Sequence, residues 1–256
     1  MKRIIILTGC VLLVFGCAKA DDKAVFKPLG KKAKETKLAV EKEITFTQEQ
    51  EPETETVKSE EPTAEPKDVN AYVHYELGKQ YQSEGDLTNA IEEFNQTIQI
   101  DAKMVGAWVQ LGHIYCELKD YEKALEMANK ALELAPQDSM THNVLARVYA
   151  NKKMSAEAIK EYQKVIELKP NYSMVYNNLA LVYLEQKRYQ EAAKLLERCV
   201  ELDSTNAIAW NSLGVCWMNL RNYTKAKESF KKALAHNPNY KTAASNLAGL
   251  QGKINH

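Results

Sequence analysis

The sequence lacks three features that would point directly to common classes of function. Its 34 basic and 34 acidic side chains leave no net charge, whereas proteins that bind DNA or RNA gather lysine and arginine against the phosphates. It has no apolar run approaching the roughly 20 residues that a membrane-spanning helix needs. It also lacks the HExxH, P-loop, GxGxxG and GxSxG motifs of common enzyme classes. We therefore expect no nucleic-acid partner, no catalytic site and no cofactor.

The N-terminus does carry a targeting segment. Lys2 and Arg3 precede an apolar run of 13 residues, Ile4 to Gly16. This run is too short to cross a bilayer but fits the apolar core of a signal peptide. We expect residues 1–16 to be removed from the mature protein.

The end of this run, Val14-Phe15-Gly16-Cys17, resembles the bacterial lipoprotein signal. In that family the cysteine becomes the new N-terminus and carries the lipid, which implies cleavage before Cys17 and a lipid on it. Leu7-Thr8-Gly9-Cys10 matches the pattern more closely, but too short an apolar run precedes it. The resemblance implies a lipid anchor in the bacterial cell envelope, on the periplasmic face of the outer membrane if the cell has two membranes. An ordinary secreted protein and an uncleaved anchor are the alternatives.

Residues 17–68 form a charged linker. They contain few apolar side chains, four prolines and many charges, mostly lysine in the first half and glutamate in the second. Such a composition buries too little apolar surface to offset the entropy lost on ordering. We expect a disordered tether with an end-to-end distance of roughly 40 Å.

The rest of the chain repeats every 34 residues. With Ala71 as position 1, the units are 71–104, 105–138, 139–172, 173–206 and 207–240. Position 7 is always leucine, position 8 is glycine or alanine, position 11 is aromatic and position 20 is alanine. Positions 4, 7, 8 and 11 share one face of a helix, and small residues allow a second helix to approach closely. Each unit is thus expected to be a helix–turn–helix.

This pattern resembles the tetratricopeptide repeat (TPR) family over five units. The resemblance implies an all-α solenoid in the form of a right-handed superhelix with a concave and a convex face. Residues 241–256 begin a sixth unit and then stop, and we interpret them as a polar C-terminal capping helix. The linker 17–68 and the repeats from residue 69 onwards are therefore separate parts of the chain.

In this family, partners usually lie in the concave groove, on positions 2, 5, 9 and 12 of the first helix of each unit, with positions 6 and 13 at the margins. The candidate partner-binding residues are Tyr75, Lys79, His113, Asn143, Arg147, Asn177, Asn178, Leu181, Asn211 and Met218. The carboxylate clamp of chaperone-binding TPRs needs Lys at position 5 and Asn at position 9, which neither Tyr75 with Lys79 nor Val109 with His113 supplies.

Asparagine recurs at position 5 in three consecutive units, as Asn143, Asn177 and Asn211. An amide offers one acceptor group and two donors, so such a row is able to grip the backbone of an extended peptide. It resembles the asparagine ladder of the O-GlcNAc transferase superhelix, although only Asn178 and Asn246 match that ladder's position. The alternative is that these asparagines are ordinary solvated helix residues.

The histidines and cysteines show no metal spacing and no redox motif. Cys199 and Cys216 fall on helices that should pack together. They form either a disulfide in an oxidising compartment or two small buried residues.

The function expected from these features is that of a membrane-anchored scaffold or adaptor that binds a protein or an extended peptide in its groove. Assembly of a cell-envelope complex is the expected setting, because pilus and secretin assembly lipoproteins with TPRs resemble this layout. The alternative is a non-catalytic accessory subunit of a polysaccharide or peptidoglycan machinery.

Overall fold

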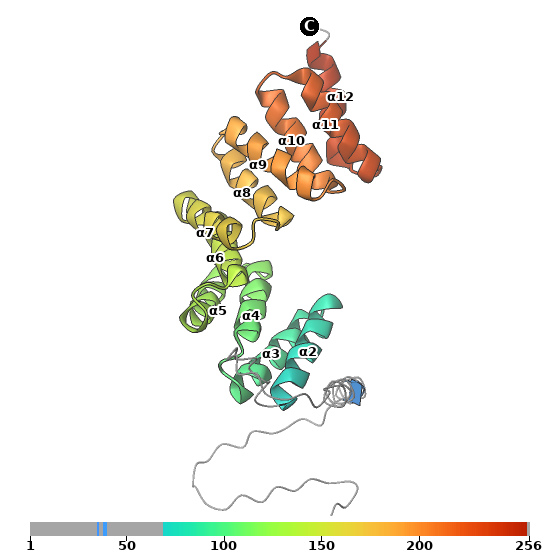
Figure 1. Ribbon diagram of the computed structural model, residues 1–256. Coiled ribbons are helices and arrows are strands. Elements are labelled where there is room, and N and C mark those ends of the chain that lie inside the picture. The colour runs from blue at the N-terminus through green and yellow to red at the C-terminus, as the bar shows by residue number, and fades with distance from the viewer. Residues whose placement is uncertain (1–34, 36–37, 40–68, 255–256) are drawn as a thin grey trace, which may run out of the picture.

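The structure is a computed structural model that describes residues 35, 38–39 and 69–254. Between residues 69 and 254 it contains eleven helices, α2 to α12, and no strand (Figure 1). The all-α prediction is confirmed for this part of the chain. None of the described helices is long and apolar enough to cross a membrane. The signal peptide 1–16, Cys17, nearly all of the linker and residues 255–256 lie outside the described residues.

Three linker residues, Glu35, Leu38 and Ala39, are described, and they are helical and exposed. The expectation of a disordered linker stays a prediction, because the other residues of 17–68 lie outside the described part of the chain. The local sequence is rich in lysine, glutamate, alanine and leucine, which all have high helix propensity.

The helices form five pairs and one final helix, and they are stacked from one end of the molecule to the other (Figure 1). The pairs are α2 (Val69–Ser83) with α3 (Leu87–Ile100), α4 (Val105–Glu117) with α5 (Tyr121–Leu134), α6 (Ser139–Asn151) with α7 (Ser155–Leu168), α8 (Ser173–Glu185) with α9 (Tyr189–Leu202), and α10 (Ala207–Asn219) with α11 (Tyr223–His236). The last helix is α12 (Lys241–Ile254).

The turn inside each pair explains why the second helix always begins at the same place. The residue at position 15 has a positive φ in all five units: Gly85, Lys119, Lys153, Lys187 and Arg221. This left-handed residue ends the first helix. The next residue caps the second helix in three units, where the side chains of Asp86, Asp120 and Asn222 accept from the backbone N–H three residues on.

We expect Met154→Asp to stabilise the third pair. Met154 occupies the N-cap of α7 without a side-chain hydrogen bond, whereas Asp120 at the same position of the preceding pair makes one. A capping carboxylate should raise the free energy of unfolding by about 1 kcal/mol. Urea denaturation of wild type and variant measures it, with Asp120→Ala as the reverse control that should lose a similar amount.

The packing order explains why the first helices form the inner surface of the array. Each second helix packs both on its own first helix and on the first helix of the next pair. From α4 onwards, neighbouring first helices also contact one another, in the series α4, α6, α8, α10 and α12. Among the described helices, neighbouring second helices make no comparable contacts. The first helices therefore lie closer together, on the concave side.

In the first and fifth units, the glycine at position 8 makes room for a side chain rather than for a helix backbone as expected. At Gly112 the expected backbone approach is present, because a Cβ there would lie 3.7 Å from the backbone oxygen of Ala124, besides 3.0 Å from Cγ1 of Val144. A Cβ placed on Gly214 would lie 2.5 Å from Cε1 of Phe230, and one on Gly78 would lie 2.7 Å from Cε1 of Phe94. Both rings are fully buried at position 24 of their units. Where position 8 is alanine, in the third and fourth units, position 24 is tyrosine or leucine. Gly214 and Phe230 therefore form one interlocking unit.

Gly214→Ala should overfill this contact and lower the free energy of unfolding by about 1–3 kcal/mol. Thermal or urea denaturation measures it. Gly249→Ala is the matched control, because a Cβ there meets no atom within 4 Å and alanine is the better helix former. If the two variants had the same stability, the interlocking would not matter.

Candidate functional site

The inner surface of the array exposes large apolar side chains. Met174 and Ile208, both at position 2 of their units, are 54% and 57% exposed, and Leu181 at position 9 of α8 is 42% exposed. Isolated exposed apolar residues are common. These three come from two neighbouring first helices, α8 and α10, and give this half of the surface an apolar character.

The position-5 asparagines lie beneath this surface and not on it. Asn143, Asn177 and Asn211 are only 3%, 9% and 7% exposed. First helices approach one another closely at position 5, so the amides are enclosed between them. An open row of amides facing a partner is therefore not the arrangement found, and the expectation that these three residues face the groove is corrected. Their contribution to partner binding stays a prediction.

Two of these asparagines bond with asparagines at position 6. Nδ2 of Asn246 donates to Oδ1 of Asn211 over 2.9 Å, which ties α12 to α10. Nδ2 of Asn177 donates to Oδ1 of Asn178 over 3.5 Å. These bonds use part of the amide capacity within the protein, and the half-buried Asn178 keeps its own Nδ2 without a partner among the described residues.

At the N-terminal end of the surface, Tyr75 and Lys79 lie together on α2. Nζ of Lys79 is 5.5 Å from the ring centroid of Tyr75 and 2.9 Å from Oε1 of Glu76. The hydrogen bond to Glu76 raises the pKa of Lys79. Glu76 therefore balances the charge of Lys79 at this end of the surface.

The centre of the surface holds His113 and Arg147, at position 9 of consecutive first helices. Nη1 of Arg147 lies 2.8 Å from Nδ1 of His113. Arginine has no acceptor, so Nδ1 accepts the hydrogen bond and the histidine is neutral. Burial, reinforced by the charge of Arg147, lowers the pKa of His113 from 6.5 to about 4.

Arg147 also joins a hollow between α6 and α8. Together with Asn178, Leu181 and other side chains it encloses a volume of about 240 Å³. The structure thus brings together four of the predicted residues: His113, Arg147, Asn178 and Leu181. Met218 lies apart, half-buried on α10 against the cluster that contains Phe230.

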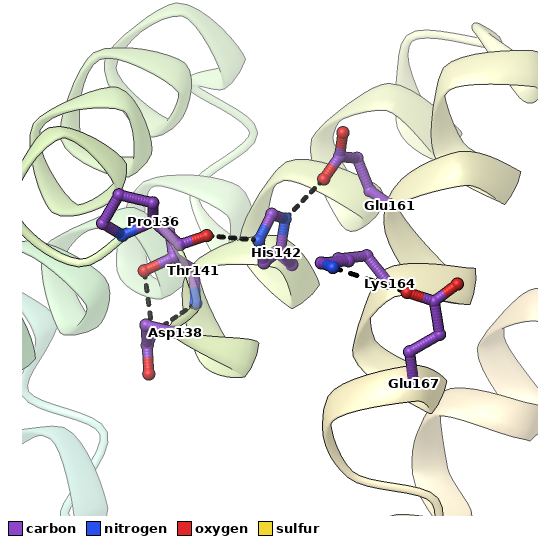
Figure 2. A network of polar contacts seen from close by, with 7 residues as sticks. All are labelled: Pro136, Asp138, Thr141, His142, Glu161, Lys164 and Glu167. Atoms are coloured by element: carbon purple, nitrogen blue, oxygen red, sulfur yellow. Dashed lines mark hydrogen bonds and ion pairs between the residues drawn. The ribbon is translucent and has the colours of Figure 1, made fainter.

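His142, which the sequence analysis did not place in the groove, organises a polar network at the start of α6 (Figure 2). Its Nδ1 lies 2.6 Å from Oε2 of Glu161 on α7, and its Nε2 lies 3.1 Å from the carbonyl oxygen of Pro136. Beside it, Asp138 caps α6 by accepting from the backbone N–H of Thr141. This histidine holds α6, α7 and the preceding turn in place.

The contact with the preceding turn recurs along the array. In three other units the side chain at position 4 donates a hydrogen bond of 2.8 Å to the backbone carbonyl oxygen six residues earlier. These side chains are Trp108, Tyr176 and Trp210. The signal was present in the sequence, since position 4 always carries a ring with a polar atom. We therefore assign the position-4 side chains a structural role and do not include them among the partner-binding residues.

Cys116, Cys199 and Cys216 are all free and buried. This favours the interpretation of Cys199 and Cys216 as two small buried residues over a disulfide between them. Burial raises the pKa of the Cys199 thiol to about 11 and that of Cys216 to about 12, so both stay protonated and unreactive at neutral pH. In the part of the chain that the structure describes, no group of three histidine, cysteine or acidic residues is arranged to hold a metal ion.

The sequence matches three family models, each described as tetratricopeptide repeat, over residues 81–148, 137–205 and 207–240. Together they span more than half of the chain. The chain belongs to the tetratricopeptide repeat family. The TPR fold is that of a protein-binding scaffold, built to present an inner surface to partners. No curated protein sequence matches this TPR protein significantly.

Solved TPR structures share the fold at low identity. YrrB, described as a TPR protein with an unusual peptide-binding site, is 21% identical, with a TM-score of 0.54 over 68% of this chain and 90% of its own. The Pseudomonas aeruginosa pilF product is 20% identical, with a TM-score of 0.60 over 73% of this chain and 92% of its own. The Cut9–Hcn1 hetero-tetramer of the APC/C has a chain that is 18% identical, with a TM-score of 0.68 over 86% and 40%. These likenesses establish the TPR solenoid and nothing finer.

Proposed function

We propose that this TPR protein is a lipid-anchored scaffold of the bacterial cell envelope, which binds an extended segment of a protein partner along its inner surface during assembly of an envelope complex. The anchor is the lipid on Cys17, and the segment 17–68 joins it to the TPR array.

The observation that carries the binding part is the apolar inner surface of α8 and α10. Met174, Leu181 and Ile208 are each at least 42% exposed, and burying such side chains against a partner removes their apolar area from water. YrrB is described as having a peptide-binding site, and peptide binding is the kind of activity that we assign to this chain.

Leu181→Asp should abolish partner capture because it places a charge in this surface. The measurement is affinity capture of the full chain followed by mass spectrometry. Leu134→Asp is the matched control: Leu134 is also 42% exposed, but it lies at the end of the second helix α5. Loss of the same partners from both variants would contradict binding at the inner surface.

The identity of the captured partner distinguishes the two candidate functions. A captured polysaccharide or peptidoglycan enzyme would favour the role of an accessory subunit over that of an assembly scaffold.

The anchor is tested by metabolic labelling with a palmitate analogue. Wild type and Cys10→Ser should be labelled, whereas Cys17→Ser should not, because the proposal places the lipid on Cys17 alone. The labelled protein should sediment with membranes, since a multiply acylated terminus binds them stably. Label that persists in Cys17→Ser, or a wild type that takes up none, would overturn the anchor.

A further inference from the structure

We infer that the hollow at Arg147 binds a carboxylate of the partner segment, supplied by an aspartate or glutamate side chain or by a free C-terminus. This inference rests on the proposed function, because it assigns a specificity to the same inner surface.

The described part of the chain does not balance the charge of Arg147. Among the described residues no carboxylate forms an ion pair with Arg147, whereas Arg188 and Arg198 each pair with a glutamate three residues on in their own helices. Among the described residues, the Arg147 guanidinium uses one N–H, which donates to His113. An arginine side chain has five N–H donors, so most of the fork remains available to an acceptor.

His113 cannot supply the missing negative charge. Because its Nδ1 accepts from Arg147, the ring carries its proton on Nε2 and is neutral. The contact therefore orients the guanidinium without neutralising it. Holding the fork in one orientation reduces the entropy lost when it binds a planar acceptor.

The walls of the hollow suit one acidic group. Asn178 offers its Nδ2 as a donor, and Leu181 and Val182 provide an apolar wall for methylene groups. Two charged residues, Lys153 and Glu185, also line the hollow, but they pair with each other, with Nζ 2.8 Å from Oε1. The net charge available to a ligand is thus the single positive charge of Arg147.

This charge favours a carboxylate over a phosphate. A phosphate monoester carries close to two negative charges at neutral pH, and the single positive charge of Arg147 would balance only one of them. A carboxylate has one charge and a planar pair of oxygens that matches the guanidinium fork. The volume of about 240 Å³ accommodates such a side chain together with part of its backbone.

The position of the cation in this hollow is fixed by the fold, unlike that of a flexible surface lysine. It is built from two consecutive first helices, α6 and α8, and its cation is fixed by a third, α4, through His113. A partner segment that runs along the inner surface from the apolar part at Met174 and Ile208 would pass this hollow. We therefore expect the recognised sequence to combine apolar residues with one acidic residue.

The test uses the full chain and pools of random extended peptides that differ at one fixed central residue: glutamate, glutamine or phosphoserine. Each pool is made with free and with amidated C-termini, and binding is measured by fluorescence polarisation. Wild type should prefer either the glutamate pool to the glutamine pool or the free acids to the amides by about tenfold or more, which corresponds to one charge-assisted bond. A preference for glutamate that survives amidation identifies a side-chain carboxylate, whereas binding of both pools that weakens about tenfold on amidation identifies a C-terminal carboxylate.

Arg147→Gln should remove this preference while the residual binding of the glutamine pool remains. Arg198→Gln, which removes an exposed arginine on α9, should keep it. The wild-type comparison of glutamate and glutamine pools needs no variant, so it stands even if Arg147→Gln unfolds.

Two results would overturn the inference while leaving the proposed function intact. One is equal binding of the glutamate and glutamine pools by wild type, with no loss on amidation. The other is stronger binding of the phosphoserine pool. If no pool binds at all, both the carboxylate site and the peptide-binding function are overturned.

Discussion

Phe230→Ala is expected to lower the free energy of unfolding by about 3–5 kcal/mol. Phe230 is fully buried on α11, in a cluster with Ala226 and with Leu250 of α12, and Trp217 packs against that cluster. Removing the ring opens a cavity at the joint between the last pair and the capping helix. Because each unit of a solenoid is stabilised mainly by its neighbours, α12 should detach as well.

Urea denaturation measures the loss, and amide hydrogen exchange locates it in α10 to α12. Leu134→Ala is the control, because Leu134 is 42% exposed and its truncation should change stability by less than about 0.5 kcal/mol. A loss below about 1 kcal/mol for Phe230→Ala would mean that α12 is not held through this ring. Intact protection of α12 in the variant would lead to the same conclusion.

Stability should also fall in acid because of His113. Burial and the charge of Arg147 hold its pKa near 4 in the folded protein, below the usual value of 6.5. Between these values the unfolded chain binds the proton and the folded chain does not, so the free energy of unfolding decreases as the pH falls through this window. The contribution is fully present above about pH 6.5, and between about pH 7 and pH 5 the loss should be about 2 kcal/mol.

The comparison that isolates this effect is His113→Gln, whose amide oxygen still accepts from Arg147 but does not titrate. Urea denaturation of both proteins across the window should show a shallower pH dependence for the variant, by about the 2 kcal/mol expected of one buried histidine. Parallel curves for the two proteins would mean that the ring is solvated and titrates normally.

The fold could be predicted from the sequence because the same 34-residue pattern occurs in five consecutive units. Each unit repeats the leucine at position 7 and the alanine at position 20, so chance variation at one site is averaged out. What the period does not reveal is which partner each small residue faces. Gly214 proved to face the ring of Phe230 rather than a helix backbone, because the pairing of positions 8 and 24 depends on three-dimensional contact.

The inner surface was harder to predict for a related reason. Helical periodicity assigns a residue to a face, but it does not give the distance between neighbouring first helices. That distance is short enough to bury Asn143 and Asn177 and to join His113 to Arg147 across 34 positions of the sequence. Position 9 could be foreseen as inward-facing, whereas the neutral state of His113 and the unbalanced charge of Arg147 follow only from the assembled helices.

The most direct test of the account is photo-crosslinking from single positions of the anchored, full-length protein in membranes. A photoreactive amino acid is placed at Leu181 on the inner surface or at Leu134 on a second helix, two sites that are equally exposed. The account predicts a discrete adduct with a partner protein from Leu181 and none from Leu134. A discrete adduct from Leu134 with none from Leu181 would contradict the claim that this TPR protein binds its partner along the concave surface.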